Sequence, residues 1–387
     1  MSSTKTAVLD AELVQKHDTY LNWMSNNTPT MWWHDSADPK ELAAGLERGC
    51  VGVTTNPVLA ATALKANREL WGAEIHAVLS RNLSPAERAE ALLKIAVTKT
   101  AEKLLPEFVA SKGERGYVCA QVSPLLVGNR DGMINMARRL HSWAPNICVK
   151  LPASRAGIDA IEACAAEGIS TNATVSFTLP QILAVGEQTK LGIQKAKEKG
   201  IVPAKSFATM MIGRLDDYLR EVAHDNRIDI PEDDIQHSGM AVVKRAYALY
   251  HERGYETMLL IAALRGTNHV TELVGGDLVL SIHPSIQDKV MAKPLSHERG
   301  INKPVAMETI GRLSQIREFV RAYEPDGMSS DEFIAHGATQ RTVSQFIEVG
   351  WKALESFQTE TKSVPRPPSP PSHRKSVRVG MEDSGEV

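Results

Sequence analysis

The sequence predicts an α/β protein folded as a (β/α)8 TIM barrel, and three observations support this fold class. Eight short apolar segments alternate with longer helical segments between residues 30 and 293. The short segments carry apolar residues on both faces, as parallel strands do when helices cover them. Eight such units in roughly 260 residues match the usual size of this barrel. A doubly wound open sheet is the alternative, but no Gly-x-Gly-x-x-Gly turn follows the first strand.

The strands are expected where short apolar runs occur, and the helices where longer periodic segments end at a glycine. The predicted strands cover residues 30–34, 51–55, 117–122, 147–151, 169–174, 206–212, 258–264 and 278–282. Glycine commonly follows a helix because it adopts the left-handed conformation without strain. Predicted helices 41–48, 158–167, 181–199 and 242–253 are followed in this way by Gly49, Gly168, Gly200 and Gly254.

The rest of the chain is expected to flank the barrel. Beyond the eighth strand, the apolar spacing predicts two helices, over residues 305–323 and 331–357, that pack across the barrel or its mouth. Dense prolines and serines with few apolar residues then indicate a disordered tail, which we interpret as a solvated spacer. The predicted organisation is an N-terminal helical segment (1–29), the barrel (30–293), C-terminal helices (294–361) and the tail (362–387).

Composition limits the classes of partner and compartment. The 387 residues carry a net charge of -2, which argues against nucleic acid or an anionic membrane as the main partner. No apolar stretch approaches the roughly 20 residues that span a bilayer, and the first residues lack a signal-peptide core. No Cys-x-x-Cys pair occurs, so the cysteines are expected to be buried thiols in the cytoplasm. They are Cys50, Cys119, Cys148 and Cys164.

Lys150 is the strongest candidate for a nucleophile. It interrupts an apolar strand and is preceded by Ile147, Cys148 and Val149. Burial penalises a charged amine and favours the neutral form, which a Schiff-base enzyme uses to attack a sugar carbonyl. A lone lysine more often lies at a strand edge and faces water. The residues at the other strand ends favour the catalytic interpretation.

Polar side chains follow the other predicted strands, where catalytic groups of such barrels lie. Each has an ordinary alternative, since Asp35 could cap a helix, Asn56 could start a turn and Arg214 could form a surface ion pair. Taken together they favour a site, because a ring of buried polar groups is costly unless it has a function. In strand order these groups are Asp35, Thr54, Thr55, Asn56, Gln121, Lys150, Asn172, Thr174, Arg214 and Arg265.

Several of these segments resemble the transaldolase family. They are Thr-Thr-Asn-Pro at 54–57, Val-Lys-Leu-Pro-Ala-Ser at 149–154, Glu-Gly-Ile-Ser-Thr-Asn-Ala-Thr at 167–174, Met-Ile-Gly-Arg at 211–214 and Ala-Ala-Leu-Arg at 262–265. The resemblance spans about residues 30–290 and implies a class I aldolase barrel that needs no metal or other cofactor. It also implies transfer of a dihydroxyacetone unit between sugar phosphates, in carbohydrate metabolism of the pentose-phosphate type, and a possible homodimer.

The resemblance assigns roles to individual positions. Lys150 would form the Schiff base, Asp35 would be the acid and base, and Thr174 would position water. The fourth catalytic position is Gln121. The implied substrate-binding residues are Thr55, Asn56, Asn172, Met211, Arg214 and Arg265, of which the two arginines would bind phosphate.

The chain departs from the family pattern at three positions. Transaldolases usually carry a glutamate where this chain has Gln121, and an amide cannot relay protons. Fructose-6-phosphate aldolases have glutamine there and a tyrosine at the position of Met211. Ala263 replaces a serine that binds phosphate. These departures keep two alternatives open, a fructose-6-phosphate-aldolase-like or specialised sugar-building aldolase and a non-catalytic sugar-phosphate-binding barrel.

Overall fold

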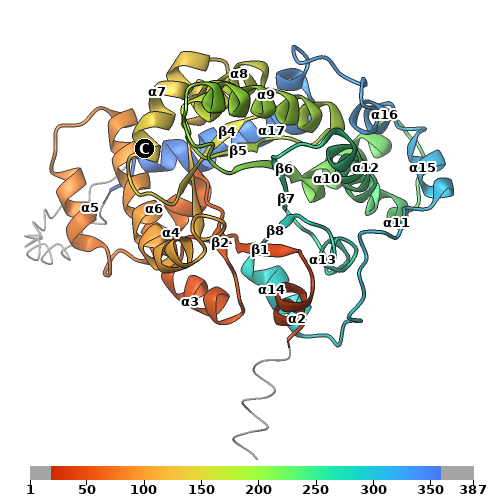
Figure 1. Ribbon diagram of the computed structural model, residues 1–387, viewed down its shortest axis with the longest axis horizontal. Coiled ribbons are helices and arrows are strands. Elements are labelled where there is room, and N and C mark those ends of the chain that lie inside the picture. Colours follow the sequence, from red (N-terminus) through yellow and green to blue (C-terminus); the bar gives the residue numbers. More distant parts are fainter. Residues whose placement is uncertain (1–18, 359–387) are drawn as a thin grey trace, which may run out of the picture. The chain divides into compact units, whose positions relative to one another are not determined.

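The computed structural model describes residues 19–358, and its eight parallel strands close into a barrel in chain order (Figure 1). This confirms the predicted fold, and every predicted strand is present within a few residues of its expected bounds. The strands are β1 (Met31–His34), β2 (Gly52–Val53), β3 (Tyr117–Gln121), β4 (Ile147–Pro152), β5 (Thr171–Thr174), β6 (Ser206–Met211), β7 (Met258–Ala262) and β8 (Val279–Ile282).

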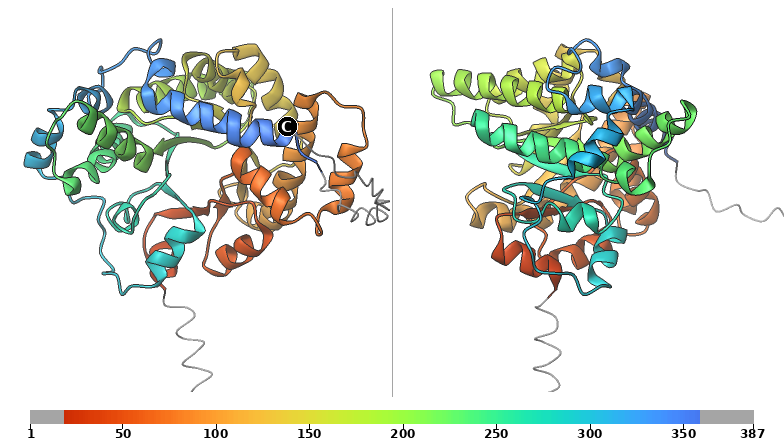
Figure 2. Two further views of the ribbon diagram at one scale, coloured as in Figure 1. Left: turned by 180° about the vertical axis from the view of Figure 1, so that it is seen from behind. Right: turned by 90° about the vertical axis from the view of Figure 1, so that its right-hand side faces the viewer.

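Helices connect the strands and cover the outside of the barrel (Figures 1 and 2). The four helix-ending glycines have positive φ, as predicted: Gly49, Gly168, Gly200 and Gly254. The connecting helices are α3 (Pro39–Glu47), α4 (Pro57–Ala66), α5 (Gly72–Leu79), α6 (Pro85–Ala110), η1 (Pro124–Leu126), α7 (Arg130–His141), α8 (Arg155–Ala166), α9 (Leu179–Glu198), α10 (Ile212–Asp225), α11 (Glu232–Ile235), α12 (Ser238–Arg253), α13 (Asn268–Thr271) and α14 (Pro284–Met291).

The barrel interior is a packed core beneath the carboxyl ends of the strands. Trp33 lies at its centre, and its ring meets the edge of Phe207 at a centroid distance of 4.7 Å. Gly52 is required here, because a Cβ atom at this position would lie 2.5 Å from the indole of Trp33. Cys119 and Cys148 belong to the same interior layer. All four cysteines are buried and unbridged, which agrees with the prediction.

The C-terminal segment is divided into more and shorter helices than predicted. The single helix expected over 305–323 is two helices, because Ile316 between them is extended and its side chain is fully buried. The helix expected over 331–357 begins only after His336, which is extended and buried. The elements are α15 (Met307–Leu313), α16 (Arg317–Tyr323), η2 (Phe333–Ala335), α17 (Gly337–Gln345), the π-helical η3 (Phe346–Trp351) and α18 (Lys352–Glu355).

The π-helical turn η3 packs closely against the start of α4. A Cβ atom at Gly350 would lie 2.7 Å from the backbone nitrogen of Val58 and 2.8 Å from Pro57, so glycine permits this approach. The long helix formed by α17, η3 and α18 crosses one side of the barrel in Figure 2. This contact places the junction of α17 and η3 beside the first residues of α4, at the mouth of the barrel.

The predicted end segments are only partly described. Helix α2 (Tyr20–Asn27) lies within the predicted N-terminal segment. The first 18 residues and the predicted tail lie outside the described residues. Among the helices of residues 19–358, none is long and apolar enough to cross a bilayer.

Candidate active site

A cavity of about 400 Å³ opens where the strands end. Six of the predicted site residues line it, and they come from five strand ends and from the start of α10. They are Asp35, Asn56, Lys150, Met211, Arg214 and Arg265. Seven further polar or aromatic residues on its wall were not predicted: Thr209, Ser281, His283, Ser285, Lys289, Gln345 and Phe346.

Lys150 lies on β4 and is only 5% exposed. Its Nζ donates a hydrogen bond to the carbonyl oxygen of Thr55, at 3.3 Å. Within residues 19–358 the amine has no carboxylate partner within 4.0 Å. Its neighbours in register are Gln121 on β3 and Asn172 on β5. The amine therefore reaches the cavity from a buried strand without the ion pair that usually accompanies a buried lysine.

Asp35 follows β1 and is oriented by a chain of hydroxyl groups. Thr54 donates to Asp35 Oδ1 at 2.6 Å, and Thr54 Oγ1 lies 2.6 Å from Ser281 Oγ. Because a carboxylate only accepts, the single hydroxyl proton of Thr54 points to Asp35, and Ser281 must donate to Thr54. The capping role considered for Asp35 belongs to Asp38, which accepts from the first backbone N–H groups of α3.

The other predicted groups around Lys150 lie beside it on the strands rather than on the cavity wall. Asn172 accepts a hydrogen bond from Thr209 at 2.7 Å and donates to the sulfur of Cys119 at 3.3 Å. Gln121 Oε1 and Thr174 Oγ1 are buried and have no hydrogen-bond partner among the described residues 19–358. Two unpaired polar oxygens buried on the strands that flank β4 are costly unless a small polar molecule binds there.

The two threonines after β2 have different positions. Thr55 is not part of the cavity wall, since its hydroxyl donates to the carbonyl oxygen of Cys119 at 2.7 Å. Thr54 contacts Asp35 instead. Asn56 caps α4 with Oδ1, which accepts from Val58 and Leu59, and this leaves its amide donors for the cavity. Alternate side chains of an extended segment point to the same face, so Thr54 and Asn56 are expected on the cavity side and Thr55 on the other side.

Arg214 lies in the first turn of α10 and is largely buried. Its guanidinium carbon is 5.8 Å from the ring centroid of Phe346, and Nη1 donates to Thr342 at 3.4 Å. Burial and the nearby charge of Arg265 lower the pKa of Arg214. A buried cation of this kind favours an anionic ligand, which would offset the cost of its desolvation.

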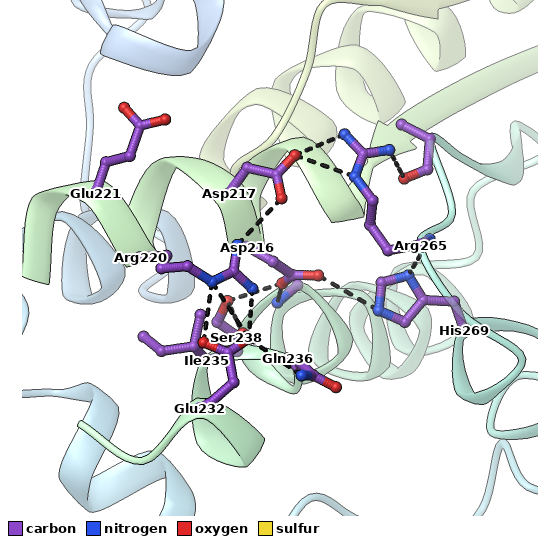
Figure 3. A network of polar contacts seen from close by, with 12 residues as sticks. Asp216, Asp217, Arg220, Glu221, Glu232, Ile235, Gln236, Ser238, Arg265 and His269 are labelled. Atoms are coloured by element: carbon purple, nitrogen blue, oxygen red, sulfur yellow. Dashed lines mark hydrogen bonds and ion pairs between the residues drawn. The ribbon is translucent and has the colours of Figure 1, made fainter.

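Arg265 follows β7 and is held in place by Asp217 on α10 (Figure 3). Nε and Nη2 donate to Asp217 Oδ2 at 3.0 and 2.7 Å, and Nη1 donates to the carbonyl of Ala263 at 3.0 Å. Ala263 has a φ of 58°, a left-handed conformation that is uncommon for alanine. The turn after β7 is therefore shaped to carry the Arg265 side chain.

Apart from Thr209 on β6, the unpredicted wall residues belong to β8 and to the segments that follow it. Ser281, His283 and Lys289 belong to β8, its following residue and α14, and Gln345 and Phe346 belong to the junction of α17 and η3. The alternation of β8 could have identified Ser281. No local pattern could have identified Phe346, because only tertiary packing brings it to Arg214.

Comparison with known proteins gives a consistent result. The family model described as Transaldolase/Fructose-6-phosphate aldolase matches residues 32–356. A transaldolase of Neisseria gonorrhoeae is 33% identical over 236 residues, 59% of this chain and 64% of the relative. A transaldolase of Thiobacillus denitrificans is 34% identical over 199 residues, 50% of this chain and 54% of the relative. The chain thus matches less than two thirds of the length of these curated relatives.

Proposed function

The chain belongs to the transaldolase/fructose-6-phosphate aldolase family, and we propose that it transfers a dihydroxyacetone unit between sugar phosphates through a Schiff base on Lys150. One observation carries this proposal. The buried amine of Lys150, which has no ion-pair partner among the described residues, shares a cavity with the carboxylate of Asp35 and with Arg214 and Arg265. A nucleophile, a base and two phosphate-binding groups are the parts that this reaction needs.

The reaction proceeds through an imine. Lys150 Nζ attacks C2 of the donor ketose, and loss of water gives a protonated imine that withdraws electrons from C3. Asp35 takes the proton of the C4 hydroxyl, the C3–C4 bond breaks, and its electron pair forms an enamine while an aldose leaves. The enamine then attacks the carbonyl carbon of the acceptor aldose, and Asp35 returns the proton. Water hydrolyses the imine and releases the new ketose.

The hydrogen-bonded chain behind Asp35 supports its role as the base. Ser281 and Thr54 fix one carboxylate oxygen, which leaves the other oxygen for the substrate. A base that is held in one orientation loses less entropy when it reaches the reacting proton.

Gln121 and Thr174 are suited to hold the water of the reaction. Their side-chain oxygens are buried without partners on the strands that flank β4. We propose that they bind the water that leaves when the imine forms and returns when it is hydrolysed. Gln121 can orient this water but cannot exchange a proton with it.

A second candidate function is cleavage without transfer. The amide of Gln121 favours it, because glutamine at this position resembles the fructose-6-phosphate aldolases, and Met211 on the cavity wall changes the substrate pocket. In that case water or another acid protonates C3 of the enamine, and hydrolysis releases free dihydroxyacetone.

The test is reductive trapping with borohydride in the presence of fructose 6-phosphate, followed by peptide mass mapping. The proposal predicts an adduct on the peptide that contains Lys150. Lys289 also lines the cavity and provides a matched control. Lys289→Gln should keep the adduct, and Lys150→Met should lose it. A protein without an adduct, or with an adduct on Lys289, contradicts the proposal. Product analysis with and without an acceptor aldose then separates transfer from release.

A further inference from the structure

Arg265 is held at two points by neighbouring residues of one helix, and we propose that Asp216 and His269 are positioning residues that fix Arg265 for anion binding. The inference rests on the proposed function, because it concerns the group that would bind the substrate phosphate. Asp217 holds the guanidinium end of Arg265 directly. Asp216, the preceding residue of α10, acts on the backbone of Arg265 through His269 (Figure 3).

His269 lies between Asp216 and Arg265 and is almost fully buried. Its side chain is 2% exposed and that of Asp216 is 3% exposed. The Nε2 atom lies 3.3 Å from Asp216 Oδ2, and Nδ1 lies 3.3 Å from the backbone nitrogen of Arg265. A backbone N–H can only donate, so Nδ1 accepts, and the ring proton is therefore on Nε2, where it meets the carboxylate.

Asp216 is itself anchored from a third element. Its Oδ1 accepts hydrogen bonds from Ser238 Oγ at 2.8 Å and from the backbone N–H of Gly239 at 2.7 Å, both in the first turn of α12. A Cβ atom at position 239 would lie 2.9 Å from Asp216 Oδ1, so glycine allows this close contact. Both oxygens of the carboxylate therefore have partners, Oδ1 on α12 and Oδ2 on His269, and the carboxylate orients the ring of His269.

These contacts leave the guanidinium of Arg265 with a defined set of free N–H donors. Arginine has five N–H donors, and Arg265 uses three of them, two on Asp217 and one on the carbonyl of Ala263. The two that remain are one hydrogen on Nη1 and one on Nη2. These form the fork that matches two oxygens of a phosphate. Its direction depends on the turn after β7, which His269 holds.

Two substitutions separate the two contacts of His269. In His269→Asn, the side-chain oxygen takes the place of Nδ1 and can still accept from the backbone of Arg265. In His269→Gln, the terminal amide takes the place of Nε2 and can still donate to Asp216. Tyr250→Phe is a matched control, because it removes a buried hydrogen bond of 2.7 Å to Ile182 that does not involve Arg265.

The first measurement compares kinetics with fructose 6-phosphate and with unphosphorylated fructose. We expect His269→Gln to raise KM for fructose 6-phosphate about three- to tenfold, with kcat and the KM for fructose unchanged. His269→Asn should recover most of the loss. Tyr250→Phe should lower the melting temperature without a difference between the two sugars. Equal effects of His269→Gln on both sugars, or none, would overturn the inference.

A second measurement does not depend on catalysis. Inorganic phosphate should raise the melting temperature of the wild-type protein and of Tyr250→Phe, and the rise should be smaller in His269→Gln and absent in Arg265→Ala. If no adduct forms on Lys150 but phosphate binding follows this order, the proposed function fails and the positioning role stands. If His269→Gln binds phosphate as tightly as the wild type, the positioning role is wrong whatever the trapping result.

Discussion

The ring of Phe346 lies over the guanidinium of Arg214, at 5.8 Å, although Phe346 lies far beyond the last strand of the barrel in the sequence. Phe346 is almost fully buried at the start of η3, and Arg214 is in the first turn of α10. A π-helical turn inside a helix often marks a functional site. Here this turn brings an aromatic face to a partly buried cation on the cavity wall.

Phe346→Leu should weaken phosphate recognition more than it weakens the fold. Leucine keeps apolar volume but removes the ring that stabilises the Arg214 cation, which is worth roughly 0.5–1 kcal/mol at a partly exposed site. We expect KM for fructose 6-phosphate to rise about two- to fivefold, with little change for fructose. Phe333→Leu is the control, because Phe333 is equally buried in η2 and is not on the cavity wall. The same KM change in both variants would show that packing alone is responsible.

Thr54→Val should slow the carbon–carbon step without preventing imine formation. Valine has the shape of threonine but cannot donate to Asp35, so the base loses its fixed orientation. A hydrogen bond to a charged group of this kind predicts a kcat lower by roughly 10- to 100-fold. Borohydride trapping on Lys150 should persist. Thr100→Val, which removes a buried hydroxyl contact inside α6, should leave kcat unchanged. Loss of trapping in Thr54→Val would mean that Thr54 supports Lys150 rather than Asp35.

The fold was predictable because most strands are short runs of apolar residues and four of the helices are followed by a glycine with positive φ. Gly168 and Gly200 ended two helices within one residue of the expected position. The C-terminal helices were less predictable. Ile316 fits a helical pattern, but its burial in an extended conformation divides the helix, and packing of this kind overrides local preference.

The site was predictable as far as it depends on strand ends. Lys150 and Arg265 reach one cavity because the carboxyl ends of parallel strands meet at one face of a barrel. The alternation of β8 could have placed Ser281 on the cavity wall, but the contacts that orient the catalytic and binding groups were not predictable. Ser281 acts on Asp35 only through Thr54, and His269 acts on Arg265 through its backbone, so neither carries a recognisable motif. Such contacts follow from side-chain geometry that one sequence does not display.

Acid should destabilise the protein partly through His336. Burial lowers the pKa of His336 to about 4, and neither ring nitrogen has a hydrogen-bond partner in the described part of the chain. The unfolded chain takes up this proton near pH 6.5 whereas the folded chain does not. Stability is therefore complete above pH 6.5 and is lost as the pH falls toward 4, by roughly 2 kcal/mol at pH 5. Urea unfolding between pH 5 and 7.5 measures this loss.

His336→Phe isolates that contribution. Phenylalanine keeps an aromatic ring between Phe177 and Tyr218 but takes up no proton. The loss of stability between pH 7.5 and pH 5 should shrink by about 2 kcal/mol in this variant. His34, whose pKa burial also lowers to about 4, remains in both proteins and cancels in the comparison. His224→Gln, at an exposed site, should keep the wild-type pH dependence. An undiminished acid sensitivity in His336→Phe would contradict the assignment.

Gln121→Glu should restore a proton relay and raise turnover. The side-chain oxygen of Gln121 is buried and unpaired in register with Lys150, so a carboxylate there would hold the reaction water and exchange protons with it. Burial would raise the pKa of the new carboxyl group, so the gain should grow as the pH rises through that value. We expect imine formation and hydrolysis to quicken several-fold above neutral pH, and transfer to gain over release of dihydroxyacetone. Gln121→Met, which fills the same space without polar atoms, should be slower than the wild type at every pH. If Gln121→Glu is no faster at any pH, Asp35 already supplies the proton, and the amide at position 121 serves only to orient water.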